Sequence, residues 1–368
     1  MSLLRHLLPL SFILILSACA YEIPDMTPEE TRRIEQLTQR MTPRCIGRYL
    51  VDLPDGFVLN EMSRTEIEAV RIVITPEKES RFLTHFERRK GTLQSQQLPL
   101  SGNPLLKGMV SLPDDAVGGI FDRAESAASS GRAARTLELW AWKSGFKIRA
   151  DIDAFDGTYP EDAGSAFHRK NGNNTPTKLA HLSSIYKRLD GRADSEIPTE
   201  QGVCFPNGFL RGAPTDAEWI DLNYHLSTAE DVYFRFVSMS DIGAEENTLL
   251  DRGSEINAML KEVNGRTLRK GARAVNSQGI EEWLVMRESD PGVKDYHFVL
   301  EMNALDGNAF KPSVTFEMSS GVRKPGPQLS LEEFATRKPI AKATLGEAES
   351  VALWDKVTAT LRPRPGAF

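Results

Sequence analysis

The 368-residue sequence predicts an α+β protein of two similar mixed domains, each a mainly antiparallel sheet with packed helices. One observation behind this prediction is that short motifs recur along the chain at a nearly constant spacing. Pro54-Asp-Gly-Phe57 recurs as Pro206-Asn-Gly-Phe209 after 152 positions, and Ile152-Asp-Ala-Phe-Asp-Gly157 resembles Met302-Asn-Ala-Leu-Asp-Gly307 after 150 positions. Repeats this long indicate a tandem duplication of whole domains, because solenoid repeats are much shorter. The alternative is that two unrelated α/β domains share common turn chemistry.

The other observation is an alternation of apolar and polar residues, which predicts strands with one solvent-exposed face. Strands are expected in residues 70–74, 137–142, 146–155, 220–226, 232–236, 280–286, 296–302 and 314–318. Apolar stripes at helical spacing predict helices in residues 76–90, 178–189, 248–262 and 347–361. Helices follow runs of strands, which argues against a Rossmann-type fold. We place the two domains at residues 45–196 and 199–368, each long enough to bury a full core.

The N-terminus predicts export and lipidation. Leu7–Leu16 is an apolar run of ten residues, too short to span a bilayer, which takes about 20 residues, and typical of a secretory signal. Leu16-Ser-Ala-Cys19 resembles a bacterial lipobox, which implies a signal peptide over residues 1–18 and lipidation of Cys19. The residue after the cysteine is Ala20, which implies the outer membrane. The alternative is an ordinary signal peptide with a chance cysteine.

Residues 19–44 are interpreted as the lipidated cysteine followed by a tether that contains one helix. Thr27-Pro-Glu-Glu30 is a capping box with proline at the first helical position. Ile34 and Leu37 form only a thin apolar stripe, so we expect the helix to act as a spacer against the membrane or the body of the protein.

Charge and cysteine content narrow the possible partners. Removal of the signal, with its Arg5, leaves 44 basic and 51 acidic residues, a net charge of −7. No basic run dominates, which argues against nucleic acid, and membrane contact is expected only through the anchor. Cys45 and Cys204, each placed just before the first strand of its domain, are expected to form a disulfide in an oxidising compartment. Two buried free thiols are the alternative.

Motifs for catalysis are missing from the sequence. G-x-S-x-G, the phosphate-binding loop, H-E-x-x-H and C-x-x-C do not occur. The five histidines after the signal are scattered, and His225 and His297 fall on the polar side of alternating strands, where we expect exposed residues. We therefore predict no catalytic residue, no metal site and no cofactor.

Three segments together resemble a known family. They are Cys45-Ile-Gly-Arg-Tyr-Leu-Val-Asp-Leu-Pro-Asp-Gly56, Ser195-Glu-Ile-Pro-Thr-Glu-Gln-Gly-Val-Cys204 and Leu353-Trp-Asp-Lys-Val-Thr-Ala-Thr-Leu-Arg-Pro-Arg-Pro-Gly366. In this order they are similar to segments of the immunity proteins that guard against the fourth class of type VI secretion lipase effectors. The resemblance covers nearly the whole chain after residue 40.

The resemblance implies a periplasmic, lipid-anchored inhibitor that is not an enzyme and whose partner is a cognate lipase effector. It also implies two α/β domains that close on the effector like the arms of a clamp. It names no interface, so the effector-binding residues are unknown at this point. Two alternatives stay open, which are an envelope hydrolase with a dispersed active site and a structural outer-membrane lipoprotein.

Overall fold

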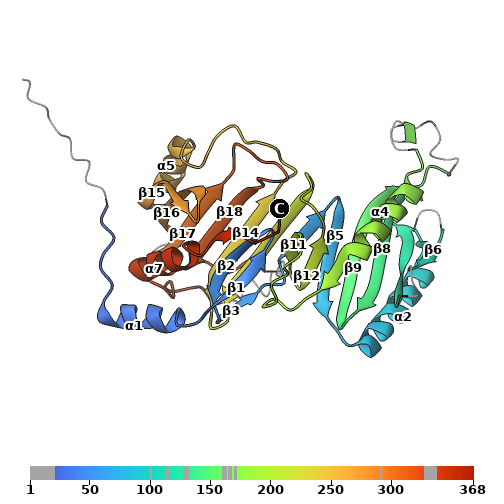
Figure 1. The fold of residues 1–368 in the computed structure, drawn as a ribbon, viewed down its shortest axis with the longest axis horizontal. Helices are drawn as coiled ribbons and strands as arrows, with labels where there is room; N and C mark the ends of the chain where they lie inside the picture. The colour runs from blue at the N-terminus through green and yellow to red at the C-terminus, as the bar shows by residue number, and fades with distance from the viewer. Residues whose placement is uncertain are drawn as a thin grey trace, which may run out of the picture.

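The computed structural model describes residues 21–99, 102–112, 116–126, 132–159, 164, 168–169, 172–290, 292–326 and 338–368. One antiparallel sheet of thirteen strands runs along the whole length of the molecule (Figure 1). Within the described ranges, no helix is both long and apolar enough to cross a membrane.

The strands of the large sheet come from both halves of the chain. The first half supplies β3 (Phe57–Leu59), β4 (Arg64–Ile67), β5 (Val70–Pro76), β6 (Leu106–Ser111), β7 (Gly118–Ala124), β8 (Ala134–Lys143) and β9 (Phe146–Phe155). The second half supplies β13 (Glu218–Leu226), β14 (Ala229–Met239), β15 (Arg266–Val275), β16 (Gln278–Asp290), β17 (Val293–Met302) and β18 (Ser313–Ser320). The order across the sheet is β15-β16-β17-β18-β14-β13-β4-β5-β9-β8-β7-β6, and β3 also pairs with β13.

From the centre of the sheet outward, the strands of the two halves are arranged in the same way. They run β4-β5-β9-β8-β7-β6 in the first half and β13-β14-β18-β17-β16-β15 in the second. Each half begins with a short hairpin, β1 (Met41–Ile46) with β2 (Tyr49–Pro54) or β11 (Gly202–Phe205) with β12 (Gly208–Arg211). Each half then places a helix after its first two central strands, α2 (Glu79–Ser95) or α5 (Gly253–Glu262). Each closes with a helix and a short strand, α4 (Thr175–Arg188) with β10 (Leu189–Gly191) or α7 (Glu347–Thr358) with β19 (Arg362–Pro363).

The closing strands cross between the halves. β10 of the first half pairs with β12 of the second, and β19 of the second half pairs with β2 of the first. At the centre of the large sheet, β4 pairs with β13 over four residue pairs. The halves are therefore interlocked, and the expectation of a separate sheet in each domain is wrong.

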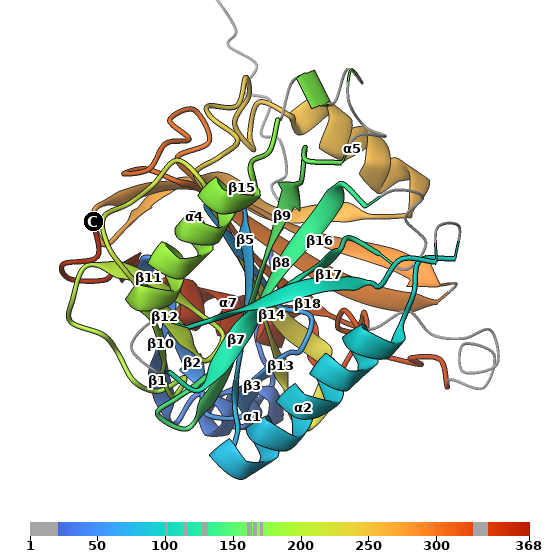
Figure 2. The ribbon, with the colours of Figure 1, turned by 90° about the vertical axis from the view of Figure 1, so that its right-hand side faces the viewer.

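Helices α4 and α2 lie on opposite faces of the first-half strands (Figure 2), and α7 and α5 lie on opposite faces of the second-half strands. In β8, Leu137, Leu139 and Ala141 share a buried cluster with Leu182 of α4, whereas Trp140 points to the other side and packs with Phe86 of α2. The side chains of β16 alternate in the same way, so that one set packs on the side of α7 and the other set on the side of α5. The main core lies on the side of α4 and α7 and is continuous through both halves.

Aromatic side chains fill the core of the second half. Phe316 stacks on Phe234 at 5.4 Å and on Trp354 of α7 at 5.8 Å between ring centroids. Trp354 is fully buried, and burying a large apolar side chain contributes roughly 1.5–3 kcal/mol. This packing holds α7 to the sheet.

The tether helix α1 (Pro28–Leu37) forms with the predicted capping box, and it lies against the body of the protein. Ile34 is buried, and the Arg33 guanidinium makes a bidentate ion pair with Glu349 of α7 at 2.5 Å. Tyr21 lies just before the helix. The Arg266 guanidinium lies over its ring, 4.3 Å from the ring centroid, and donates a hydrogen bond to its hydroxyl. Residues 21–37 are thus attached to the second half.

Most of the predicted strands and helices are confirmed, with shifted ends, as is the α+β class. The pattern missed β6, whose side chains are mostly exposed, and β15, which is rich in arginine. It also missed the short hairpins β1–β2 and β11–β12, whose residues are buried or half-buried in runs and do not alternate. Consequently Cys45 and Cys204 lie inside the first strand of each half and not before it.

Candidate protein-binding face

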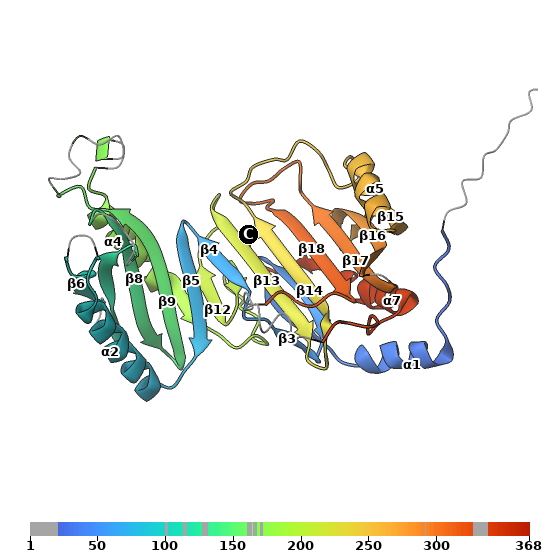
Figure 3. The same cartoon turned by 180° about the vertical axis from the view of Figure 1, so that it is seen from behind.

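Among the residues that the structure describes, no helix covers the middle of the large sheet on the side of α2 and α5 (Figure 3). Figure 3 shows this side, with strands running between α2 at one end and α5 at the other. We define the open face by the side chains that point this way, opposite to the core residues of their strands. They are Arg64, Glu66, Arg71, Val73, Thr75, Arg149, Asp151, Asp153, Trp219, Asp221, Asn223, His225, Tyr233, Arg235, Glu317 and Ser319.

Ion pairs and stacked cations cross the open face from strand to strand. The Arg71 guanidinium binds both carboxylate oxygens of Asp153 at 2.8 and 3.0 Å. Arg235 binds both oxygens of Asp221 at 2.8 and 3.1 Å. Such bidentate pairs hold side chains in fixed geometry, and this face therefore presents charges in an ordered array.

Several acidic groups on this face are crowded and partly desolvated. Burial raises the pKa of Glu317, and the nearby Asp221 carboxylate raises it further. Burial likewise raises the pKa of Asp151, with a contribution from Glu138. Beside the open face in β17, burial lowers the pKa of His297 to about 4, so that this imidazole is neutral near pH 7.

Polar atoms without a protein partner gather on the same face. Shielded side-chain atoms with no hydrogen-bond partner among the described residues include Thr75 Oγ1, Arg149 Nε, Asp151 Oδ1, Trp219 Nε1, Asn223 Oδ1 and His225 Nδ1. A buried polar group left unpaired costs about 1–3 kcal/mol, which is why most such groups are satisfied. Their concentration on one face is what a surface that hydrogen-bonds another molecule would have.

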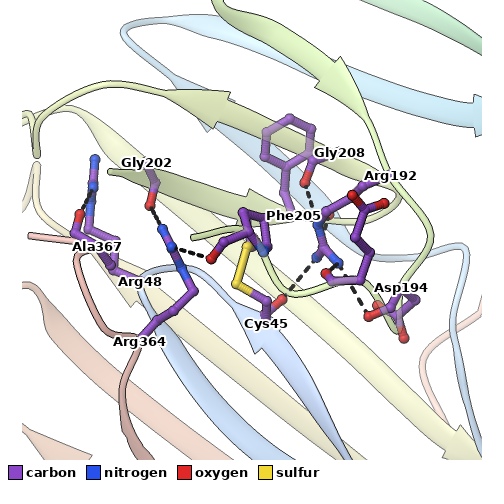
Figure 4. The surroundings of a disulfide bond; sticks show 12 residues. Cys45, Arg48, Arg192, Asp194, Gly202, Phe205, Gly208, Arg364 and Ala367 are labelled. Carbon is purple, nitrogen blue, oxygen red and sulfur yellow. Dashed lines mark hydrogen bonds between the residues drawn. A yellow bond between two sulfur atoms is a disulfide. The ribbon is translucent and has the colours of Figure 1, made fainter. Parts of the chain in front are cut away.

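The structure joins Cys45 and Cys204 in a disulfide where the two small hairpins meet (Figure 4). The Cα atoms are 5.7 Å apart, and Gly47 and Cys204 exchange backbone hydrogen bonds of 2.8 and 3.0 Å beside them. Both cysteines are fully buried. The bond therefore ties together the first strands of the two halves.

Three buried arginines surround the disulfide and hold the centre of the chain in place. Arg192 donates to the carbonyls of Cys45 and Gly208, both at 3.1 Å, and Arg364 donates to the Gly202 carbonyl at 2.6 Å (Figure 4). Burial lowers the pKa of Arg364 to about 10. Arg48 completes the group through a bidentate pair with Glu218 at 2.6 and 3.0 Å. These contacts give the three arginines a structural role.

The residues singled out from the sequence fall in different places. Cys19 lies outside the described residues. His225 and His297 do lie opposite the apolar core, but both are half-buried and His297 bonds Ser319, so the expectation of exposed histidines is wrong. Within the described part of the chain, no group of three His, Cys, Asp or Glu side chains could hold a metal ion.

The residues of the open face were not named as a site from the sequence. In the sequence these residues are visible only as the polar members of each alternating strand pattern. That pattern says which residues share a side of one strand, but it does not say which strands become neighbours. β4 and β13 are 151 positions apart at Ile67 and Glu218 and still pair with each other.

Comparison with known proteins identifies the family. The N-terminal domain of Tle cognate immunity protein 4 matches residues 42–192, and the C-terminal domain of the same family matches residues 196–366. The chain therefore belongs to the Tle cognate immunity protein 4 family, and it is an immunity protein and not an enzyme. No curated protein sequence matches the chain.

Solved structures share the fold at low sequence identity. The crystal structure of a Tle4–Tli4 complex contains a chain that is 21% identical, with a TM-score of 0.66 over 89% of this chain and 98% of that one. The apo immunity protein TplEi of the type VI secretion system of Pseudomonas aeruginosa is 22% identical, with a TM-score of 0.65 over 89% and 98%. TplEi complexed with a peptide called "L" is 22% identical, with a TM-score of 0.60 over 88% and 98%.

Proposed function

We propose that this protein binds a type VI secreted lipase effector and inhibits it stoichiometrically, which protects the producing cell. The observation that carries the proposal is the match of both family domains, in order, over residues 42–192 and 196–366. The Tle4–Tli4 complex, in which the similar chain is found with its effector, supports it. An inhibitor of this kind needs a large ordered surface and no catalytic group.

We place the effector on the open face, between α2 and α5. This face spans both halves across the β4–β13 pair, so one partner can contact both halves at once. Its ordered ion pairs and unpartnered polar atoms suit a partner that supplies complementary groups. In this proposal the two halves hold the effector as one rigid clamp, because the disulfide and the crossed strands β10 and β19 fix them to each other.

The location follows from the N-terminal residues, also as a proposal. Leu16-Ser-Ala-Cys19 would place a lipid anchor two residues before Tyr21, which Arg266 and Glu347 hold against the second half. Two residues of extended chain span at most about 7 Å, so the anchor would keep this end of the body close to the membrane. The proposed location is the periplasm, at the inner leaflet of the outer membrane, where a lipase acting on periplasmic membrane faces would be intercepted.

The matching order of elements supports the proposed duplication. Hairpin, two strands, helix, four strands, helix and short strand follow each other in both halves, and β3 is the main addition. Cys45 and Cys204 occupy equivalent positions in β1 and β11. We propose domains 45–196 and 199–368, with 19–44 as the lipidated tether that precedes them.

A titration tests the proposed function directly. The soluble chain, residues 20–368, is added to the purified cognate lipase effector, and lipase activity is measured on phospholipid vesicles. Activity should fall linearly and end at one protein per lipase, without dependence on time. Progressive loss at substoichiometric amounts would show turnover and overturn the proposal.

Two arginine variants test the proposed face in the intact chain. Arg235→Ala removes an open-face guanidinium, whereas Arg269→Ala removes one paired with Asp355 on the α7 side. The two side chains are similarly exposed, at 37% and 34%. We expect Arg235→Ala to weaken lipase binding by about 2 kcal/mol or more, about thirtyfold, and Arg269→Ala to leave it within about twofold. Equal effects would place the interface elsewhere.

A further inference from the structure

Strand β5 loses one of its two neighbours halfway along its length. Its pairing with β4 consists of Ile67↔Val70 and Glu66↔Arg71 and ends there. On the other side its pairing with β9 continues from Arg71 to Pro76. All of β4 pairs with β13 on its other edge, and its first residues, Arg64 and Thr65, pair with β13 alone. From Ile72 onward, β5 is therefore an edge strand in the middle of a thirteen-stranded sheet.

A slot separates this edge from the segment that precedes β4. The cavity has a volume of about 360 Å³. One wall is Ile72–Thr75, and the other is formed by residues 59–61, 63 and 65. Pro206 and Asn207, in the turn of the β11–β12 hairpin, line it as well. Because Val73 and Thr75 belong to the open face, the slot opens within the proposed effector surface.

The backbone of β5 directs hydrogen-bonding groups into the slot. Glu68 and Ala69 form the two-residue turn between β4 and β5 with φ of 52° and 63°, so that Ile67 and Val70 are the hydrogen-bonded pair that flanks it. Strands alternate the direction of their backbone groups, so the C=O of Ile72 and the N–H and C=O of Ile74 point to the same side as those of Val70. The Asn207 Nδ2 donates to the Ile74 carbonyl at 3.2 Å, which agrees with this direction.

The walls of the slot indicate what it accepts. The side chains beside the edge are mostly uncharged, and Val73 is 54% exposed and leaves its apolar surface next to the opening. An unpaired edge with backbone donors and acceptors is a template for another strand.

We propose that the slot binds an extended segment of the lipase effector, which adds a short strand beside Ile72–Thr75. The proposal rests on the proposed function and names the part of the surface that recognises the effector backbone. Main-chain hydrogen bonds would supply affinity, and small uncharged side chains at alternate positions of the segment would fit the walls. The added strand would restore the second neighbour that β5 lacks.

Filling the slot tests the proposal with a matched control. Glu61→Trp places a large ring on a residue that lines the slot, and Met62→Trp places the same ring on the next residue, which is 41% exposed and does not line it. We expect Glu61→Trp to raise the dissociation constant for the lipase at least tenfold, and Met62→Trp to leave it within twofold. Wild-type affinity for Glu61→Trp, with circular dichroism unchanged, would overturn strand addition.

Amide hydrogen exchange gives a readout that does not depend on a variant. In the complex of wild-type protein with the lipase, exchange of the Ile74 amide should slow at least tenfold, and overlapping lipase peptides should locate the segment that causes this. If the lipase binds and Ile74 exchanges as in the free protein, strand addition is wrong while the proposed function stands. If Ile74 is protected by a second copy of this chain alone, the occupant is that copy and the proposal is wrong. If the wild-type protein does not bind the lipase at all, the proposed function itself fails.

Discussion

Loss of the Cys45–Cys204 disulfide should lower the free energy of unfolding by several kcal/mol. The bond closes a loop with a sequence separation of 159 residues. In the chain-entropy description, a loop of this length removes about 17 cal/mol/K from the unfolded chain, which is about 5 kcal/mol at 25 °C. We expect about 3–5 kcal/mol in practice, because a compact unfolded state has less entropy to lose.

The assay is urea unfolding of Cys45→Ala/Cys204→Ala beside the wild type. The midpoint should fall, and the slope of the free energy against urea should rise because the uncrosslinked chain exposes more surface on unfolding. Fully reduced wild-type protein is the control, since it keeps both sulfur atoms and separates the cross-link from lost side-chain volume. Native contacts beside the bond, such as the Gly47–Cys204 backbone pair, remain in both samples.

The reasoning would be refuted by a change of less than about 1 kcal/mol in both samples. That result would mean that the unfolded chain keeps the two strands near each other without the bond. Thiol labelling of protein isolated from cells and denatured without reduction checks the premise, and it should find neither Cys45 nor Cys204 free.

Three more predictions concern titrating groups and the anchor. Burial raises the pKa of Glu138, but hydrogen bonds from Arg89 and Arg123 outweigh it and lower the pKa to about 2, so Glu138→Gln should lose about 3 kcal/mol in urea unfolding at pH 7. The stabilisation by Glu138 is complete above pH ~4.5 and is lost as the pH falls toward 2. The His297 imidazole should titrate near 4 by NMR, and its burial in the neutral form should cost no stability above pH ~6.5 and destabilise the fold increasingly as the pH falls toward 4. Cys19→Ser should leave the protein unlabelled by fatty acid and in the soluble periplasmic fraction.

Each of these three predictions has an outcome that would contradict it. A Glu138→Gln penalty that does not shrink between pH 7 and pH 3 would mean that lost packing, and not charge, explains it. A His297 imidazole that titrates near 6.5 would show that the ring is solvated. A membrane-associated, fatty-acid-labelled Cys19→Ser protein would refute lipidation at this position.

The sequence alone determined the family and many of the local elements. Alternation in residues 146–155 and 220–226 predicts strands because a strand with one buried face must alternate, whatever its neighbours are. Thr27 and Glu30 specify the start of α1 through contacts three residues apart. These are short-range properties, which is why they could be read directly from the chain.

Only the tertiary structure decided how the halves meet. Three features depend on contacts between segments far apart in the sequence: β10 pairs with β12, β4 pairs with β13, and β5 keeps only β9 as a neighbour beyond Arg71. The open face exists for the same reason, since each strand contributes only a few polar side chains to it. Period-two alternation shows on which side of its strand a residue lies. Which other strand pairs with it depends on the packing of the whole core.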